Sequence, residues 1–133
     1  MTDHDVYRRA AALIEQSAHV LLTTHIRPDG DACGCVRALQ ETLTAMGKTA
    51  DLLFMSPLAS WYRALFDGPT PVLGTENDDI APDQLDARYR DTDLVIIVDT
   101  NSRVQLPHIS DWLASCGKKI LVIDHHITGD TLA

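Results

Sequence analysis

Three short stretches of this sequence place carboxylates or imidazoles directly after an apolar run. They are His25, Asp29 and Asp31 after HVLLTT, Asp99 after LVIIV, and Asp124, His125 and His126 after ILVI. A mixed set of carboxylate and imidazole ligands suits Mn²⁺ or a similar first-row ion better than a pure Ca²⁺ or Mg²⁺ cage. Because the set contains no cysteine, a structural zinc site is disfavoured. The residue types therefore point to a bound transition metal.

The first of these stretches holds two carboxylates that only one residue separates. Pro28 and Gly30 keep this loop out of helical geometry, so Asp29 and Asp31 can both turn inward and each hold a different ion. A simpler interpretation makes Asp31 only the N-cap of the helix that follows. A single Asp after a strand, such as Asp99, is also commonly a turn or cap residue.

The elements that must position these residues follow from hydrophobic periodicity. Helices are predicted over residues 4–17, from residue 31 to Gly47, as a short segment around residues 61–66, and around residues 109–113 with an end at Gly117. Strands are predicted over 19–24, 49–55, 94–98 and 119–123. Residues 67–84 are rich in Pro, Gly and acids, which predicts an exposed connection.

The alternation of strands and helices predicts an α/β fold, a mostly parallel sheet with helices on both faces. In such sheets the carboxyl ends of the strands form the crevice in which ligands bind, so the three acidic stretches should converge there. Carboxylates a few ångströms apart repel one another unless protons or cations lie between them. Convergence of three strand ends therefore strengthens the expectation of metal. His4, His19 and His108 lie outside these stretches and are interpreted as packed or solvent-facing residues.

Length, charge and composition limit the function further. A chain of 133 residues that is 45% hydrophobic suits one domain, residues 1–133. A net charge of −8 argues against a broad surface for duplex nucleic acid or an anionic membrane. The longest apolar run, residues 94–98, is far too short to span a bilayer. With no secretory signal at the start, the expected location is the cytoplasm. The three cysteines form no CxxC pair, and we expect them to be reduced, small buried residues.

Together, the three stretches resemble the motifs of the DHH phosphoesterase superfamily. His25-x-x-Pro28-Asp29-x-Asp31-Ala32-x-Gly34 resembles its first motif, Val98-Asp99-Thr100 its second, and Asp124-His125-His126 its third. The resemblance implies two Mn²⁺ ions, one held by His25, Asp29 and Asp99 and the other by Asp31, Asp99 and His125. It further implies that Asp124 orients the site, that His126 faces the substrate phosphate, and that Arg27 and Arg103 beside the motifs are candidate phosphate contacts.

The sequence also departs from the family pattern in two respects. A fourth motif, an Asp some fifty residues after the third, and a smaller substrate-gripping domain are expected of the family, and this chain stops at Ala133 before either. We therefore expect residues 1–133 to be the N-terminal catalytic domain of a longer phosphoesterase. Cys35 stands where the family often has Ser.

The resemblance implies hydrolysis of a phosphate ester, and the form HIRPDGDA favours the branch of the bacterial nanoRNases. The expected substrates are short oligonucleotides, dinucleotides or phosphonucleotides such as 3′-phosphoadenosine 5′-phosphate. Two alternatives stay open, a cyclic dinucleotide phosphodiesterase and a non-catalytic module that binds metal or nucleotide. The sequence also leaves a homodimer open.

Overall fold

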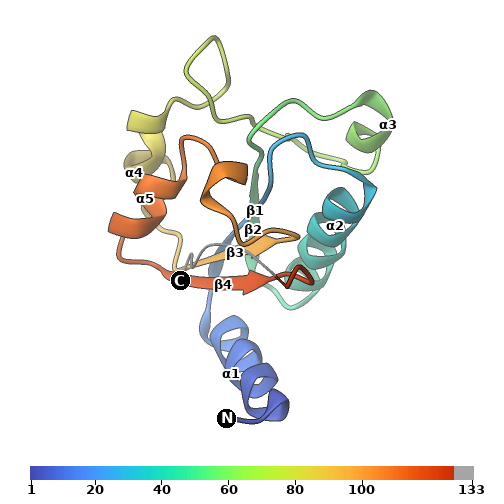
Figure 1. Cartoon of the computed structure of the whole chain (residues 1–133), viewed down its shortest axis with the longest axis vertical. Coiled ribbons are helices and arrows are strands. Elements are labelled where there is room, and N and C mark those ends of the chain that lie inside the picture. The colour runs from blue at the N-terminus through green and yellow to red at the C-terminus, as the bar shows by residue number, and fades with distance from the viewer. Residues whose placement is uncertain (128–133) are drawn as a thin grey trace.

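The computed structural model describes residues 1–127 as an α/β fold (Figure 1). Its helices are α1 (Asp3–Gln16), α2 (Gly30–Ala45), α3 (Ser60–Arg63), α4 (Leu85–Arg88) and α5 (Ser110–Ser115), and its strands are β1 (His19–Thr24), β2 (Thr49–Leu53), β3 (Leu94–Val98) and β4 (Lys119–Ile123). Two turns of 3₁₀ helix, η1 (Pro82–Gln84) and η2 (Arg103–Gln105), precede α4 and α5. The predicted strands are all present, and β2 is two residues shorter than expected.

The four strands form one parallel sheet in the order β2-β1-β3-β4. Thr24 at the end of β1 pairs with Val98 at the end of β3, and Val98 pairs with Ile123 at the end of β4. This register makes the three strand ends level, so the residues that follow them start from the same edge of the sheet. The chain turns in opposite directions from β1, to β2 on one side and β3 on the other, which makes the β1–β3 boundary the topological switch point.

Helices cover both faces of the sheet, as predicted, and each face has its own apolar core. Alternate strand residues such as Leu22 and Ile96 pack on one face with Val36 of α2. Their neighbours Leu21 and Ile97 pack on the other face with residues of α5. The five strand and α2 residues just named are fully buried, and burying a side chain of this size contributes roughly 1.5–3 kcal/mol.

The start of α2 differs from the prediction that Asp31 is its N-cap. The cap is Asp29, whose extended backbone precedes Gly30 and whose Oδ1 accepts a 3.0 Å hydrogen bond from the Ala32 amide. Asp31 lies inside the first turn instead, because the helix begins two residues earlier than the sequence indicated. The far end agrees with the prediction, since Gly47 adopts a φ of +81° directly after the helix.

The prediction that residues 67–84 are simply exposed is wrong in part. Val72, Leu73 and Ile80 are buried in this connection. Phe54 forms a parallel bridge with Val72, and Leu73 forms another with Ile80. The apolar residues inside the acidic, glycine-rich stretch anchor it to the core, whereas the composition of the stretch reflects only its exposed part.

The three cysteines differ in their exposure to solvent. Cys33 is buried, as expected, and burial raises the pKa of its thiol to about 11. Cys35 is exposed, so its interpretation as a buried residue is wrong, and Cys116 is intermediate. Cys35 lies one helical turn after Asp31 and its thiol donates to the Asp31 carboxylate at 3.8 Å. All three thiols are free.

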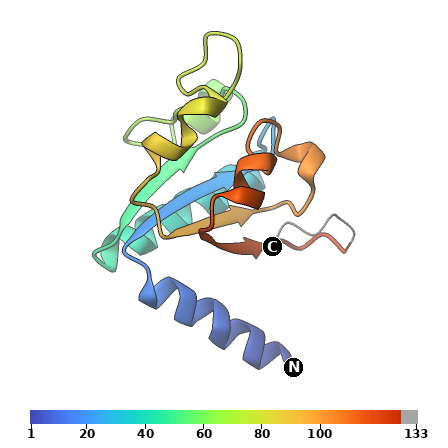
Figure 2. The same ribbon diagram turned by 90° about the vertical axis from the view of Figure 1, so that its left-hand side faces the viewer.

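The first helix extends away from the sheet, as Figure 2 shows, and none of its residues is buried. Its start is stabilised by a capping box, in which the Asp5 amide donates to Thr2 Oγ1 and the Thr2 amide donates to the Asp5 carboxylate. Within residues 1–127, none of the helices combines the length and apolar character that crossing a membrane demands.

Candidate metal centre

The acidic and imidazole side chains converge at the carboxyl edge of the sheet. His25 follows β1 and Asp99 follows β3, on the two sides of the switch point, while Asp124 and the two histidines follow β4. Ligands of open parallel sheets bind at this position because the loops diverge there and leave a crevice. The convergence expected from the sequence is therefore present.

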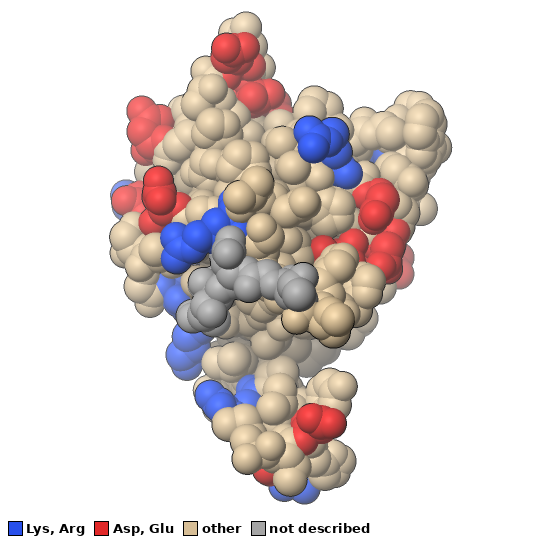
Figure 3. All heavy atoms as spheres, in the orientation of Figure 1, with Lys and Arg blue, Asp and Glu red and all other residues tan. Residues whose placement is uncertain are grey.

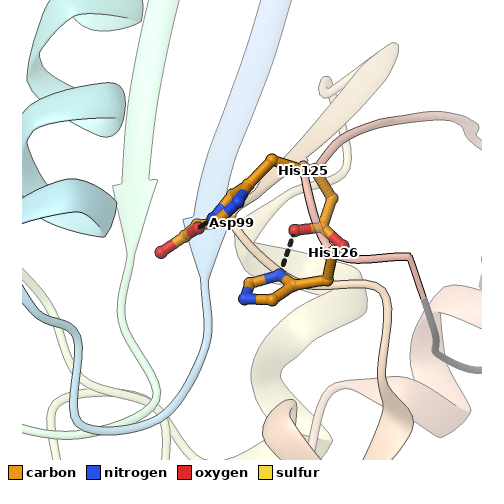
Figure 4. Close-up of side chains that lie close together, drawn as sticks. Asp99, His125 and His126 are labelled. Atoms are coloured by element: carbon orange, nitrogen blue, oxygen red, sulfur yellow. Dashed lines mark hydrogen bonds and ion pairs between the residues drawn. The ribbon is translucent and has the colours of Figure 1, made fainter.

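Asp99 is the central residue of this group. Its side chain is only 5% exposed, and its two carboxylate oxygens face two histidines, His25 Nε2 at 3.3 Å and His125 Nε2 at 2.9 Å. Figure 4 shows His125 turned toward Asp99. The backbone of Asp99 has a φ of +62°, a left-handed conformation that Asp adopts more readily than most residues. The strand thus stops sharply at Asp99 and leaves the carboxylate between the two loops.

The remaining acids complete two groups that share Asp99. His25 Nε2 lies 3.9 Å from Asp29 Oδ1, and the ligand atoms of His25, Asp29 and Asp99 all lie within 4.8 Å of one another. On the other side, His125 Nε2 lies 3.5 Å from Asp31 Oδ2 as well as close to Asp99. These are the two sets of three residues that the resemblance implied. A further group within 4.8 Å joins Asp99 and His125 to the other two residues of the third motif.

The hydrogen bond of His25 tests whether these residues fit a cation. Its Nδ1 lies 2.8 Å from the carbonyl oxygen of Ile26, which can only accept, so Nδ1 carries a proton. In the neutral ring, Nε2 then presents a lone pair to the carboxylates of Asp29 and Asp99. Lone pairs do not bond to carboxylates, so a proton or a metal ion must lie between them. The donor set therefore fits a divalent cation, with the ring held in the tautomer that metal ligation requires.

The loop that carries His25 and Asp29 is held by two neighbouring segments. The Ile26 amide donates to the carbonyl oxygen of Gln105 at 2.8 Å, and the Arg27 amide donates to Ser56 Oγ at 2.7 Å. Arg27 has a φ of +48°, which is unfavourable for a residue with a side chain. These two hydrogen bonds stabilise that turn and so place the first motif relative to the strands.

The last two residues of the third motif have different surroundings. The rings of His125 and His126 lie side by side with centroids 4.2 Å apart, but His126 Nδ1 bonds to the carboxylate of Asp124. This hydrogen bond raises the pKa of His126 above its ordinary value. The Asp124 side chain is 3% exposed, and its second oxygen has no hydrogen-bond partner among the described residues.

A cavity of about 450 Å³ lies over the group. Its lining combines the acids and histidines His25, Asp29, Asp31, Asp99, His125 and His126 with the neutral residues Thr100, Asn101, Ser102 and Gln105. Thr100 belongs to the second motif, but sequence reasoning missed Asn101, Ser102 and Gln105, although their place soon after a strand at this edge of the sheet could have indicated them. The predicted phosphate contacts Arg27 and Arg103 are not among the described residues that line the cavity.

The lining of the cavity is rich in carboxylates. On the face shown in Figure 3, the basic side chains gather mainly at the left and a group of acidic ones lies at the right, on the side of α2. Within residues 1–127 the cavity lining contains no Lys or Arg. A cation bound by the carboxylates would offset this negative charge.

Comparison with known proteins identifies the family of this chain. The family model described as "DHH family, N-terminal domain" matches residues 19–133. The chain belongs to the DHH family. Membership of this family places it among phosphoesterase-type proteins that depend on metal, and the acidic and imidazole groups described above supply suitable ligands.

Among solved structures, the fold is similar to the crystal structure of an exopolyphosphatase-related protein from Bacteroides fragilis. The TM-score is 0.76 at 19% sequence identity, and the match covers 100% of this chain and 39% of that chain. At this identity the likeness shows a shared DHH-type α/β fold. The chain thus spans less than half the length of this structural neighbour.

Proposed function

We propose that this DHH domain is the catalytic part of a manganese-dependent phosphodiesterase or phosphatase that acts on short oligoribonucleotides, dinucleotides or phosphonucleotides. The observation that carries the proposal is the placement of Asp99 between His25 and His125 at the switch point of the sheet. A buried carboxylate that faces two imidazoles, each beside a further carboxylate, is suited to bridging two cations.

Under this proposal His25, Asp29 and Asp99 hold one Mn²⁺, and Asp31, Asp99 and His125 hold the other. When bound, two such ions polarise phosphoryl oxygens and lower the pKa of a water molecule enough to make it a nucleophile at neutral pH. Two divalent cations would also balance the carboxylates of the site. A phosphate monoester or diester could then enter a cavity that is otherwise acidic.

His126 is proposed to contact the substrate. Its Nδ1 is occupied by Asp124, so Nε2 is the ring nitrogen left for a phosphoryl oxygen in the cavity that His126 lines. The raised pKa of His126 favours the protonated ring, which donates at Nε2. Asp124 acts through His126 in this scheme, because its buried carboxylate is hydrogen-bonded to that ring.

We further propose that the natural protein is longer and that a C-terminal domain completes the substrate site. The 39% coverage of the structural neighbour supports this, since that protein has room for a second domain beyond the matched part. Such a domain would supply groups that the open cavity lacks. A cytoplasmic location and a homodimer remain part of the proposal.

The test is hydrolysis of dinucleotides, 3′-phosphoadenosine 5′-phosphate and a cyclic dinucleotide by the full-length natural protein with Mn²⁺. Asp31→Asn should lower kcat/KM by at least about 100-fold, since loss of a ligand exceeds the 10- to 100-fold effect of its supporting residues. Asp111→Asn is the matched control, because Asp111 is an exposed acid in the first turn of α5. Activity on the cyclic substrate alone would favour the cyclic dinucleotide phosphodiesterase. Manganese binding without turnover of any substrate would indicate a non-catalytic module.

A further inference from the structure

Thr100, Asn101, Ser102 and Gln105, from the segment after Asp99, form a neutral wall of the cavity. Asp99, at the end of β3, has a left-handed backbone with a φ of +62°. Thr100 Oγ1 then accepts from the Ser102 amide, and the Gln105 amide donates to the Ser102 carbonyl oxygen to form η2. Asn101, Ser102 and Gln105 all line the cavity.

The backbone of Gln105 is hydrogen-bonded to the loop of the first motif. Its carbonyl oxygen accepts the Ile26 amide at 2.8 Å, and the Ile26 carbonyl oxygen in turn accepts from His25 Nδ1 at 2.8 Å. Figures 1 and 2 both place η2, drawn in orange, beside the loop that follows β1. Because only the backbone of Gln105 serves this link, its side chain can change without breaking it.

The amide of Gln105 is available to a ligand. Across residues 1–127 its side chain makes no hydrogen bond, although the residue lines the cavity. An ordinary surface glutamine would show the same lack of partners. What distinguishes Gln105 is the hydrogen bond between its backbone and the loop of His25, which keeps the start of its side chain close to the proposed metal site.

The wall suits uncharged polar groups and not a long polyanion. Amides and hydroxyls both donate and accept, as ribose hydroxyls and base edges require. A polyphosphate chain carries charge on every phosphate and is ordinarily bound by Arg and Lys, and neither residue occurs in the described lining. Beyond the proposed metal site, where one phosphoryl group would lie, the described lining offers no Lys or Arg for further phosphates.

We infer that Gln105, with Asn101 and Ser102, forms a subsite for the ribose or base next to the scissile phosphate, and that this subsite selects nucleotide phosphoesters over inorganic polyphosphate. The inference rests on the proposed function and adds the determinant of its substrate class. Gln105 is the specificity-determining residue, since it is the member of the wall tied directly to the first motif.

The experiment compares kcat and KM of the full-length natural protein on a diadenosine dinucleotide and on inorganic tripolyphosphate with Mn²⁺. Gln105→Leu should raise KM for the dinucleotide about tenfold, the effect of one neutral hydrogen bond lost to the substrate. Mn²⁺ affinity by calorimetry and the Tm should stay unchanged, because the backbone link is kept. Gln16→Leu, the same change at an exposed position of α1, is the matched control.

A second variant adds charge in place of removing a hydrogen bond. Gln105→Lys should raise kcat/KM for tripolyphosphate relative to the dinucleotide. The inference is overturned if Gln105→Leu changes KM for the dinucleotide no more than Gln16→Leu does, or if the unaltered protein prefers tripolyphosphate. Failure of the proposed function looks different, because the unaltered protein would then hydrolyse neither compound, and the inference would fall with it.

Discussion

Replacement of Asp99 by asparagine should affect the metal-free and the metal-bound protein in opposite directions. The ligand oxygens of Asp99 and Asp29 lie within 4.8 Å of each other. Two like charges at that distance repel by about 3–4 kcal/mol at an effective dielectric constant of about 20 and by about 1 kcal/mol in bulk water. Because the Asp29 side chain is 63% exposed, the lower half of this range applies.

Without metal and above pH 8, where histidine is ordinarily neutral, Asp99→Asn should therefore stabilise the protein by about 1 kcal/mol. Asn also tolerates the left-handed backbone at this position, where φ is +62°. For a domain of this size, 1 kcal/mol corresponds to a rise in Tm of about 4 °C. The assay is thermal unfolding in EDTA, followed by circular dichroism.

With Mn²⁺ at 100 times its Kd, the unaltered protein should gain about 2.7 kcal/mol, a rise in Tm of roughly 10 °C. Asp99→Asn should gain less than about 2 °C under the same conditions, since one ligand of both ions is lost. The exposed Asp91 supplies the control, and Asp91→Asn should respond to Mn²⁺ as the unaltered protein does. A full Mn²⁺-induced rise in Asp99→Asn would refute the placement of metal at this residue.

Four further substitutions test the fold and the site. Gly47→Ala should destabilise the fold by about 1 kcal/mol because Gly47 has a φ of +81°, whereas Gly34→Ala, inside α2 with open space around its Cβ, should stabilise the fold by roughly 0.5–1 kcal/mol. Urea unfolding measures both changes, and changes of the same sign would contradict the helix assignment. Asp124→Asn should lower the pKa of His126 toward its ordinary value in an NMR titration of the metal-free protein, and an unchanged titration would show that Asp124 does not set that pKa. Because the pKa is raised in the folded state, the pair stabilises the fold at low pH and loses this effect as the pH rises through the raised value. Leu22→Ala should cost about 2–5 kcal/mol in urea unfolding, since Leu22 is fully buried between the sheet and α2, and a cost below about 1 kcal/mol would contradict that packing.

The sequence pattern was sufficient to predict those features of the fold that neighbouring residues in the chain determine. Runs such as residues 94–98 are apolar throughout because both faces of their sheet are covered, so strand type could be read from the sequence directly. Gly47 and Gly117 mark helix ends because a left-handed φ follows each helix. The acidic and imidazole residues could likewise be selected, since they follow three such strands.

Other features depend on contacts that no local pattern contains. The choice of Asp29 as the N-cap of α2 follows from the backbone that β1 delivers to that loop, and Asp31 offers the same side chain two residues later. Burial of Val72 follows from a bridge with Phe54, 18 residues earlier in the chain. The exposure of Cys35 follows from which side of α2 faces the sheet.

The sequence by itself determined which residue types stand at the ends of β1, β3 and β4, because a strand's composition and the residue after it are adjacent in the chain. Only the tertiary structure decided that the strand order is β2-β1-β3-β4 and that the register makes those ends level. Another non-local hydrogen bond, from the Ile26 amide to the Gln105 carbonyl oxygen, brings Gln105 against the loop of His25, nearly eighty residues earlier in the chain. The distances between the candidate ligands depend on such pairings. Because each pairing joins segments that lie far apart in the sequence, no single segment encodes it.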